Sequence, residues 1–215
     1  MTYMEYVENY IRKQNYADPI FTEDIVPLMA KEYGLEQKKA AAATTVAIKR
    51  LMDDGKVPEL RRYQKGIFYK TKKTPLGEMK IRKRMLVERK YLSPYKGYET
   101  GAGLFHDMGL TTLMPAMEYI ATNAVHGSVK YDKKLNVTVC PPKTEITADN
   151  MDYLRVLDVL YQMDHIPYDA ENPYEIIAEY VDRCKLRYDV LLSYADRFYN
   201  QKTVLRLGHV AGQRG

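Results

Sequence analysis

Residues 35–69, LEQKKAAAATTVAIKRLMDDGKVPELRRYQKGIFY, contain the pattern that decides the fold of the first part of the chain. At the α-helical spacing of about 100° per residue, positions 38–53 separate into two faces. One face carries small and apolar residues, namely Ala40, Ala41, Thr44, Ala47, Ile48 and Leu51. The opposite face carries Lys38, Lys39, Ala42, Thr45, Val46 and Lys49, with Arg50 at its edge. An amphipathic helix with a basic outer face is therefore predicted.

Two short strands are predicted after this helix. Asp53-Asp54-Gly55 ends the helix, since glycine readily takes the left-handed conformation found at helix C-termini. Strands are predicted at 57–62 and 67–69, joined by a turn at 63–66 in which Gly66 can take a positive φ. A helix, a tight break and a basic hairpin are typical of the recognition helix and wing of a winged helix-turn-helix domain.

Two more helices are predicted before this stretch. Tyrosine and aliphatic residues recur at helical spacing over 3–14. A second helix begins near Thr22, a favourable N-cap, and ends at Gly34, with Ile25, Leu28 and Met29 on its buried side. Three helices and then a hairpin complete the winged-helix order, in which the third helix enters the DNA major groove.

The place of each residue on this predicted domain indicates which part of the DNA it is expected to contact. The residues expected to face bases are Gln37, Lys38, Ala42, Thr45 and Lys49. Those expected to contact phosphates are Lys39, Arg50, Arg61, Arg62 and Lys65, with Tyr63 reaching a phosphate or a sugar. The alternative is an ordinary alanine-rich helix whose lysines are only solvated.

Charge divides the chain into a basic front and a slightly acidic rear. Residues 1–90 hold 20 Lys and Arg against 12 Asp and Glu, a net charge of +8, whereas residues 91–215 hold 13 against 16, a net charge of −3. A basic module most often binds nucleic acid. The basic character continues through a connecting segment at 75–92, in which a helix is predicted from Glu78 to Tyr91.

The predicted fold class is α+β, with a winged helix-turn-helix domain at 1–74 and a C-terminal α+β domain at 75–215. A short helix ending at Met108, strands at 117–122, 128–131 and 135–142, and helices from Asn150 onward give this second domain a small antiparallel sheet plus helices.

The composition indicates a folded globular protein without a membrane span. The chain is 46% hydrophobic and 28% charged, as in a folded globular protein, and no apolar run approaches the roughly 18 residues of a membrane span. The acidic, amphipathic N-terminus does not have the form of a secretory leader. Cys140 and Cys184 lack metal-site spacing and are expected to be reduced, which fits a cytoplasmic protein without a membrane partner.

Motifs for catalysis or for a cofactor are not found in the sequence. The four histidines have no HxxxH spacing, and the adjacent His106 and Asp107 point about 100° apart on a helix, so they cannot share one metal ion. The phosphate-loop lysine and the GxSxG elbow are also missing. We expect neither an enzyme nor a metal or cofactor site.

Several motifs in combination resemble the AbiEi family, the antitoxins of type IV (AbiE) bacterial toxin–antitoxin systems. They include Gly66-Ile67-Phe68-Tyr69, Gly97-Tyr98-Glu99-Thr100-Gly101 and the stretch from His106 to Thr112. Pro115, Thr122-Asn123 and the helix that starts at Asn150 also fit this family.

The resemblance implies a cytoplasmic, autoregulating repressor that acts in phage abortive infection. Its winged helix would bind inverted repeats in its own promoter, and its C-terminal domain would counter a cognate nucleotidyltransferase-like toxin, with or without a stable complex. Two other functions stay open from the residues alone. They are a ligand-sensing winged-helix regulator and a non-enzymatic protein that binds RNA or a toxin.

Overall fold

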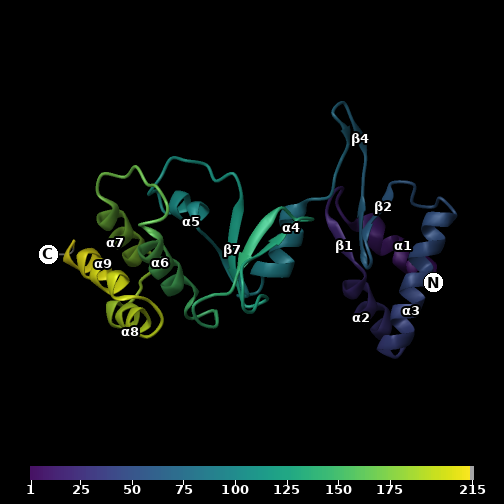
Figure 1. Ribbon diagram of the computed structural model, residues 1–215. Coiled ribbons are helices and arrows are strands. Elements are labelled where there is room, and N and C mark those ends of the chain that lie inside the picture. Colours follow the sequence, from purple (N-terminus) through teal and green to yellow (C-terminus); the bar gives the residue numbers. More distant parts are fainter. Residues whose placement is uncertain (214–215) are drawn as a thin grey trace. The chain divides into compact units, whose positions relative to one another are not determined.

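The structure is a computed structural model that describes residues 1–213. It combines helices with small sheets, so the mixed α+β class is confirmed. The chain forms two compact units, Met1–Leu86 and a second one that begins at Val87 (Figure 1). The last two residues of the predicted second domain lie outside the described residues.

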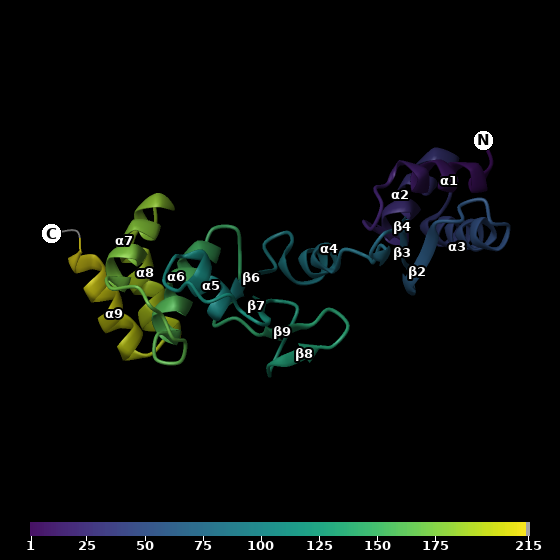
Figure 2. The same cartoon turned by 90° about the horizontal axis from the view of Figure 1, so that it is seen from above.

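The first unit contains three helices and a three-stranded sheet (Figures 1 and 2). In chain order these are α1 (Tyr3–Lys13), β1 (Pro19–Phe21), α2 (Thr22–Tyr33), α3 (Gln37–Asp53), β2 (Leu60–Gln64) and β3 (Ile67–Lys70). The three helices and the strand predicted at 67–69 agree with the predicted pattern. The strand predicted at 57–62 was wrong in its bounds, because β2 begins only at Leu60 and continues to Gln64. Strand β1 was not predicted, because three residues are too few to show an alternating pattern. It pairs antiparallel with β3, which gives the sheet order β1-β3-β2.

Helix α3 provides the centre of the first unit's core. It buries Ala40, Thr44, Ala47, Ile48 and Leu51, as the helical spacing predicts. The four apolar residues among these pack in one cluster with residues of α1, α2 and the sheet, namely Val7, Ile11, Ile25, Met29, Leu60 and Phe68. The prediction was wrong for Leu28, which is 44% exposed. Because one face of α3 is committed to this core, the opposite face is left to solvent.

A second hairpin follows β3 and reaches the start of the predicted helix at Glu78. Strands β4 (Lys73–Thr74) and β5 (Gly77–Glu78) pair antiparallel, and helix begins only at α4 (Lys83–Val87), continued by a π-helical turn, η1 (Glu88–Leu92). The predicted helix was therefore wrong for residues 78–82. The reason is that the Met79 N–H donates to the Lys72 carbonyl at 3.0 Å, which commits this backbone to the hairpin.

The boundary between the units lies at Leu86 and Val87, beyond the predicted boundary at residues 74 and 75. Arg82 explains why the intervening residues belong to the first unit. Its backbone N–H donates to the Ala17 carbonyl at 2.8 Å, and its guanidinium pairs with Asp18.

The second unit contains a four-stranded sheet of order β6-β7-β9-β8. Its strands are β6 (Gly97–Thr100), β7 (Glu118–Thr122), β8 (Lys130–Asp132) and β9 (Val137–Cys140). Two of its three pairings are antiparallel, as predicted for this domain, whereas β7 and β9 are parallel. The parallel pair arises because the chain passes from β7 to the sheet edge and forms β8 there. It then returns as β9, which lies between β7 and β8 and runs in the same direction as β7.

Within the described residues, five α-helices beyond η1 complete the second unit. They are α5 (Ala102–Asp107), α6 (Met151–Gln162), α7 (Pro173–Arg183), α8 (Tyr188–Phe198) and α9 (Gln201–Gly212). Helix α6 contacts β6 of the sheet and the helices α8 and α9. It buries Leu154, Val156, Leu157, Val159 and Leu160, so it is the central helix of this unit.

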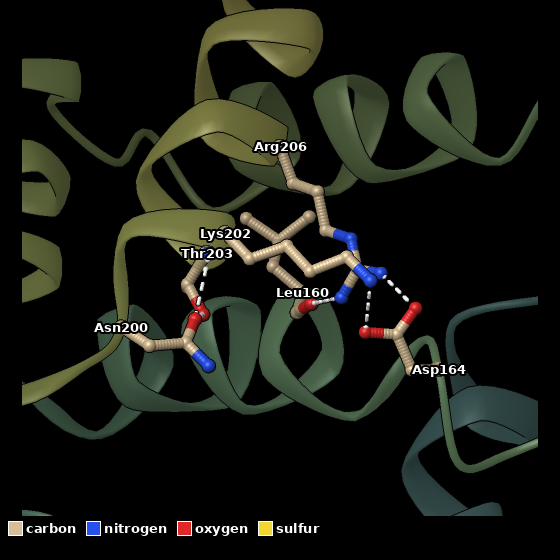
Figure 3. Close-up of polar contacts among 6 residues, drawn as sticks. All are labelled: Leu160, Asp164, Asn200, Lys202, Thr203 and Arg206. Carbon is tan, nitrogen blue, oxygen red and sulfur yellow. Dashed lines mark hydrogen bonds and ion pairs between the residues drawn. The ribbon is translucent and has the colours of Figure 1, made fainter.

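A buried arginine fastens α9 to the end of α6 (Figure 3). Arg206 is 9% exposed, donates to the Leu160 carbonyl at 2.6 Å and pairs with Asp164, which also binds Lys202 at 2.6 Å. A buried guanidinium is tolerated only when it is partnered in this way. Asn200 caps α9 by accepting from the Thr203 N–H at 2.9 Å.

The turn after β8 is held by a carboxylate with several donors. Asp132 accepts from Lys90 Nζ at 2.8 Å, from the Tyr91 hydroxyl at 2.9 Å and from the Leu135 N–H at 3.1 Å. Desolvation by itself would raise the pKa of Asp132. The lysine and the two hydrogen-bond donors outweigh it and lower the pKa to about 2.

This lowered pKa predicts a pH dependence of stability. A carboxylate whose folded pKa lies below its unfolded value of about 4 stabilises the fold above that value. This stabilisation is lost as the pH falls from about 4 to about 2. In urea titrations from pH 6 to pH 2.5, the difference in unfolding free energy between wild type and Asp132→Asn should therefore shrink across this window. A difference that stays constant across the window would contradict the prediction, and Asp149→Asn, at an exposed residue, is the control.

Candidate nucleic-acid interface

Six of the seven predicted contact residues of α3 share the face opposite the core, whereas Gln37, the first residue of the helix, lies by helical spacing on the side of Thr44 and Ile48. All seven are exposed, namely Gln37, Lys38, Lys39, Ala42, Thr45, Lys49 and Arg50. Val46 lies among them and is 48% exposed. The Thr45 hydroxyl donates to the Ala41 carbonyl at 2.9 Å, which leaves its oxygen lone pairs as acceptors. The face therefore combines fixed cations with small side chains that allow a close approach by a polyanion.

A groove of about 500 Å³ joins this face to the β2–β3 hairpin. Thr45, Lys49 and Met52 of α3 line it on one side, and Arg62 and Lys65 of the hairpin line it on the other. The structure thus brings together cations that are far apart in sequence. Met52 was not among the predicted site residues, although its spacing of three residues from Lys49 places it on the same side of the helix.

The β2–β3 turn is fixed by the start of α2. Gly66 has a φ of 77°, as predicted for this turn. Its carbonyl accepts from the Thr22 N–H at 2.9 Å and from the Thr22 hydroxyl at 3.3 Å. Thr22 is the first residue of α2 and Phe21 is the N-cap, so the predicted capping role of Thr22 was wrong. The threonine instead positions the turn that carries Lys65.

Arg61 and Tyr63 differ from the other predicted hairpin residues. Arg61 donates to the Pro58 carbonyl at 2.7 Å and pairs with Glu78 at 3.1 Å, so its guanidinium is engaged within the fold. Tyr63 is half-buried. Arg62 and Lys65 are the predicted hairpin cations that line the groove. Alternation along β2 explains the difference between Arg61 and Arg62, because neighbouring residues of a strand point to opposite faces, whereas Lys65 lies in the turn beyond the strand.

The second unit has a cavity of its own, of about 540 Å³. Its lining includes Thr100, Lys143, Asp158, Tyr161 and Gln162. The Lys143 ammonium lies 4.1 Å from the centre of the Tyr161 ring, a cation–π distance. No motif in the sequence predicts this cavity. The one local signal is an aspartate inside the otherwise apolar stripe of α6.

Asp158 is buried and fully committed to the fold. Its carboxylate accepts from the Tyr98 hydroxyl at 2.9 Å, the Thr100 hydroxyl at 3.1 Å and the Tyr199 hydroxyl at 2.8 Å. Burial raises the pKa of Asp158, and the three hydroxyl donors partly oppose that rise. Burial beside this carboxylate also raises the pKa values of Tyr98 and Tyr199. The cluster joins β6 to α6 and to the end of α8.

The stretch that carries the family resemblance has structural roles in the second unit. A Cβ at Gly97 would lie 2.4 Å from the Tyr91 carbonyl oxygen, so only glycine fits there. His106 Nδ1 donates to the Thr111 carbonyl at 3.2 Å, and the Thr112 hydroxyl donates to Asp169 at 2.5 Å. These contacts fix the loop after α5.

Within residues 1–213, no three His, Cys, Asp or Glu side chains gather in a group that could hold a metal ion. None of the helices in the same residues is long and apolar enough to span a bilayer. Cys140 and Cys184 are half-buried free thiols, and burial raises the pKa of Cys140 to about 11. No protein-family model matches the chain, and no curated protein matches it in sequence.

The geometry of the β2–β3 turn predicts opposite effects of two glycine substitutions. Gly66→Ala should lower the free energy of unfolding by about 1–2 kcal/mol, because an L-residue is strained at positive φ and the new Cβ would lie 3.1 Å from the Thr22 hydroxyl oxygen. Gly208 lies on α9, where a new Cβ would meet no atom within 4 Å. Gly208→Ala should therefore raise the free energy of unfolding by about 0.5–1 kcal/mol through helix propensity. Urea denaturation measures both, and equal effects would contradict the role of the turn.

Proposed function

We propose that the first unit is a winged helix-turn-helix domain that binds duplex DNA. The observation that carries this proposal is the element order α1-β1-α2-α3-β2-β3 with a β1-β3-β2 sheet and an exposed basic face on α3. In this assignment α3 is the recognition helix and the β2–β3 turn is the wing. The groove between them, lined by cations from both, supports the assignment.

The exposed face of α3 provides two kinds of contact with DNA. Lys38 and Lys49 can donate to guanine O6 and N7, and the methyl groups of Ala42 and Thr45 can contact thymine. The remaining cations, Lys39, Arg50, Arg62 and Lys65, suit phosphates, which fix the register without reading the sequence. Arg61 contributes only if it gives up its ion pair with Glu78.

We further propose that the protein is the antitoxin of a type IV toxin–antitoxin system. It would repress its own operon by binding promoter inverted repeats, and its second unit would counter a nucleotidyltransferase-like toxin. The support is the resemblance of Gly97–Gly101 and His106–Thr112 to the AbiEi family, together with the concentration of positive charge in the first 90 residues. Both the cytoplasmic location and the lack of enzymatic activity follow from this proposal.

A second candidate function is a ligand-sensing winged-helix regulator. The specific observation in its favour is the cavity of about 540 Å³ in the second unit, with Lys143 and Gln162 in its lining. A cavity of this size suits a small molecule. The two candidates share the DNA-binding first unit and differ in what the second unit binds.

Titration of the full chain against labelled duplex DNA tests the shared claim. We expect fluorescence anisotropy to show tight binding to the duplex from directly upstream of the gene and weak binding to a scrambled duplex. Lys38→Ala/Lys49→Ala should weaken specific binding by at least about tenfold, because it removes two base contacts. The logarithm of the binding constant should fall with the logarithm of salt concentration with a slope near −5, for about six phosphates.

A matched double substitution separates specific contacts from net charge. Lys31→Ala/Lys133→Ala removes the same charge from exposed positions outside the α3 face, and it should leave specific binding within about twofold of wild type. Equal binding to both duplexes, or equal loss in the two variants, would contradict the winged-helix proposal. Tighter binding to single-stranded RNA than to duplex DNA would favour the RNA-binding alternative.

A further inference from the structure

The β4–β5 hairpin of the first unit has a defined structure, held by strand pairing and hydrogen bonds. Lys73 pairs with Glu78 and Thr74 with Gly77, so the turn consists of Pro75 and Leu76 alone. The Thr74 hydroxyl donates to the Gly77 carbonyl at 2.8 Å, and Gly77 takes a φ of 108°. In Figure 1 the hairpin labelled β4 extends away from the other strands of its unit.

The base of this hairpin is anchored to the sheet of the first unit. The Thr71 hydroxyl donates to the Met79 carbonyl at 2.8 Å, and the Thr71 N–H donates to the Glu59 carbonyl at 2.9 Å. Arg61 on β2 pairs with Glu78 on β5 at 3.1 Å, and Ile81 beyond the hairpin is 7% exposed. The hairpin is therefore positioned before any ligand binds, which lowers the entropic cost of binding.

The exposed end of the hairpin combines an apolar tip with cations. Leu76 is 101% exposed, and Pro75 beside it is also exposed. Lys72, Lys73 and Lys80 are exposed along the two arms. Glu78, the one acid in residues 72–80, is paired with Arg61. Leu76 therefore lies outside the core, where its side chain is accessible to a ligand.

This combination has the chemistry of a minor-groove wedge. Proteins that bind the minor groove insert leucine or proline between base steps, while adjacent cations hold the phosphates on either side. The chain from Lys65 in the β2–β3 turn to Leu76 spans at most about 40 Å even when fully extended. One turn of B-DNA is about 34–36 Å long. Both turns are therefore within reach of a single duplex.

We propose that the β4–β5 hairpin is a second DNA contact, in which Leu76 enters the minor groove and Lys72, Lys73 and Lys80 bind the flanking phosphates. The inference rests on the proposed DNA-binding function of the first unit and extends it. It assigns the hairpin to DNA and not to a protein or a lipid surface, because three lysines surround one apolar residue and the Arg61–Glu78 pair joins the hairpin to β2, whose Arg62 lines the groove beside α3.

Two variants of the full chain test this assignment on the upstream duplex. Leu76→Ser should weaken binding about tenfold, since it removes the buried apolar contact, and it should abolish competition by the minor-groove ligand netropsin. Lys72→Ala/Lys73→Ala/Lys80→Ala should reduce the magnitude of the salt slope by about 3, because each of the three lysines neutralises one phosphate. All four side chains are exposed, so the fold should tolerate both variants.

Leu28→Ser is the matched control, because Leu28 is an exposed leucine of the same unit outside the hairpin. It should leave affinity and netropsin competition as in wild type. If wild type binds the duplex and both hairpin variants bind equally well, the hairpin assignment is overturned while the winged-helix function stands. If wild type does not bind the upstream duplex, both fail. A loss in Leu28→Ser equal to that in Leu76→Ser would also overturn the hairpin assignment.

Discussion

The packing of the small, apolar face of α3 into the core determines the arrangement of the first unit. Ala40, Ala47, Ile48 and Leu51 are each less than 5% exposed and lie in one cluster with α1, α2 and the sheet. Alanine at two of these positions allows neighbouring helices to approach closely, and it fixes how α3 is rotated about its axis. That rotation leaves the lysine-bearing face in solvent. The candidate DNA surface is thus a consequence of core packing.

The β2–β3 hairpin becomes part of the same surface through backbone contacts. Thr22, at the start of α2, binds the Gly66 carbonyl with both its N–H and its hydroxyl. β1, immediately before it, pairs with β3. The segment formed by β1 and the start of α2 therefore sets the position of the β2–β3 turn. This linkage accounts for a groove whose two walls come from residues 45–53 and 62–68.

The parts of the fold that were predictable from sequence are those with a local pattern. The faces of α3 follow from the spacing of its alanines and lysines, and the positive φ at Gly66 follows from the turn. Strand β1 and the β4–β5 hairpin depend on pairing with distant or very short partners, which no periodicity reveals. Arg61 shows the same limit at the site, because its engagement with Glu78 depends on a hairpin that the sequence pattern did not indicate. In the second unit, Asp158 and Arg206 are buried polar groups whose partners come from elements up to 60 residues away.

The most direct test of the central claim is to map the DNA surface on the full chain by NMR. Backbone amide shifts would be followed while the upstream duplex is added. The account predicts that the large shifts cluster at 37–50 on α3, at 62–66 in the β2–β3 hairpin and at 72–80 in the β4–β5 hairpin, while the amides that line the cavity around Asp158 stay unchanged. Shifts that cluster in the second unit, or that spread evenly over every exposed lysine, would contradict it.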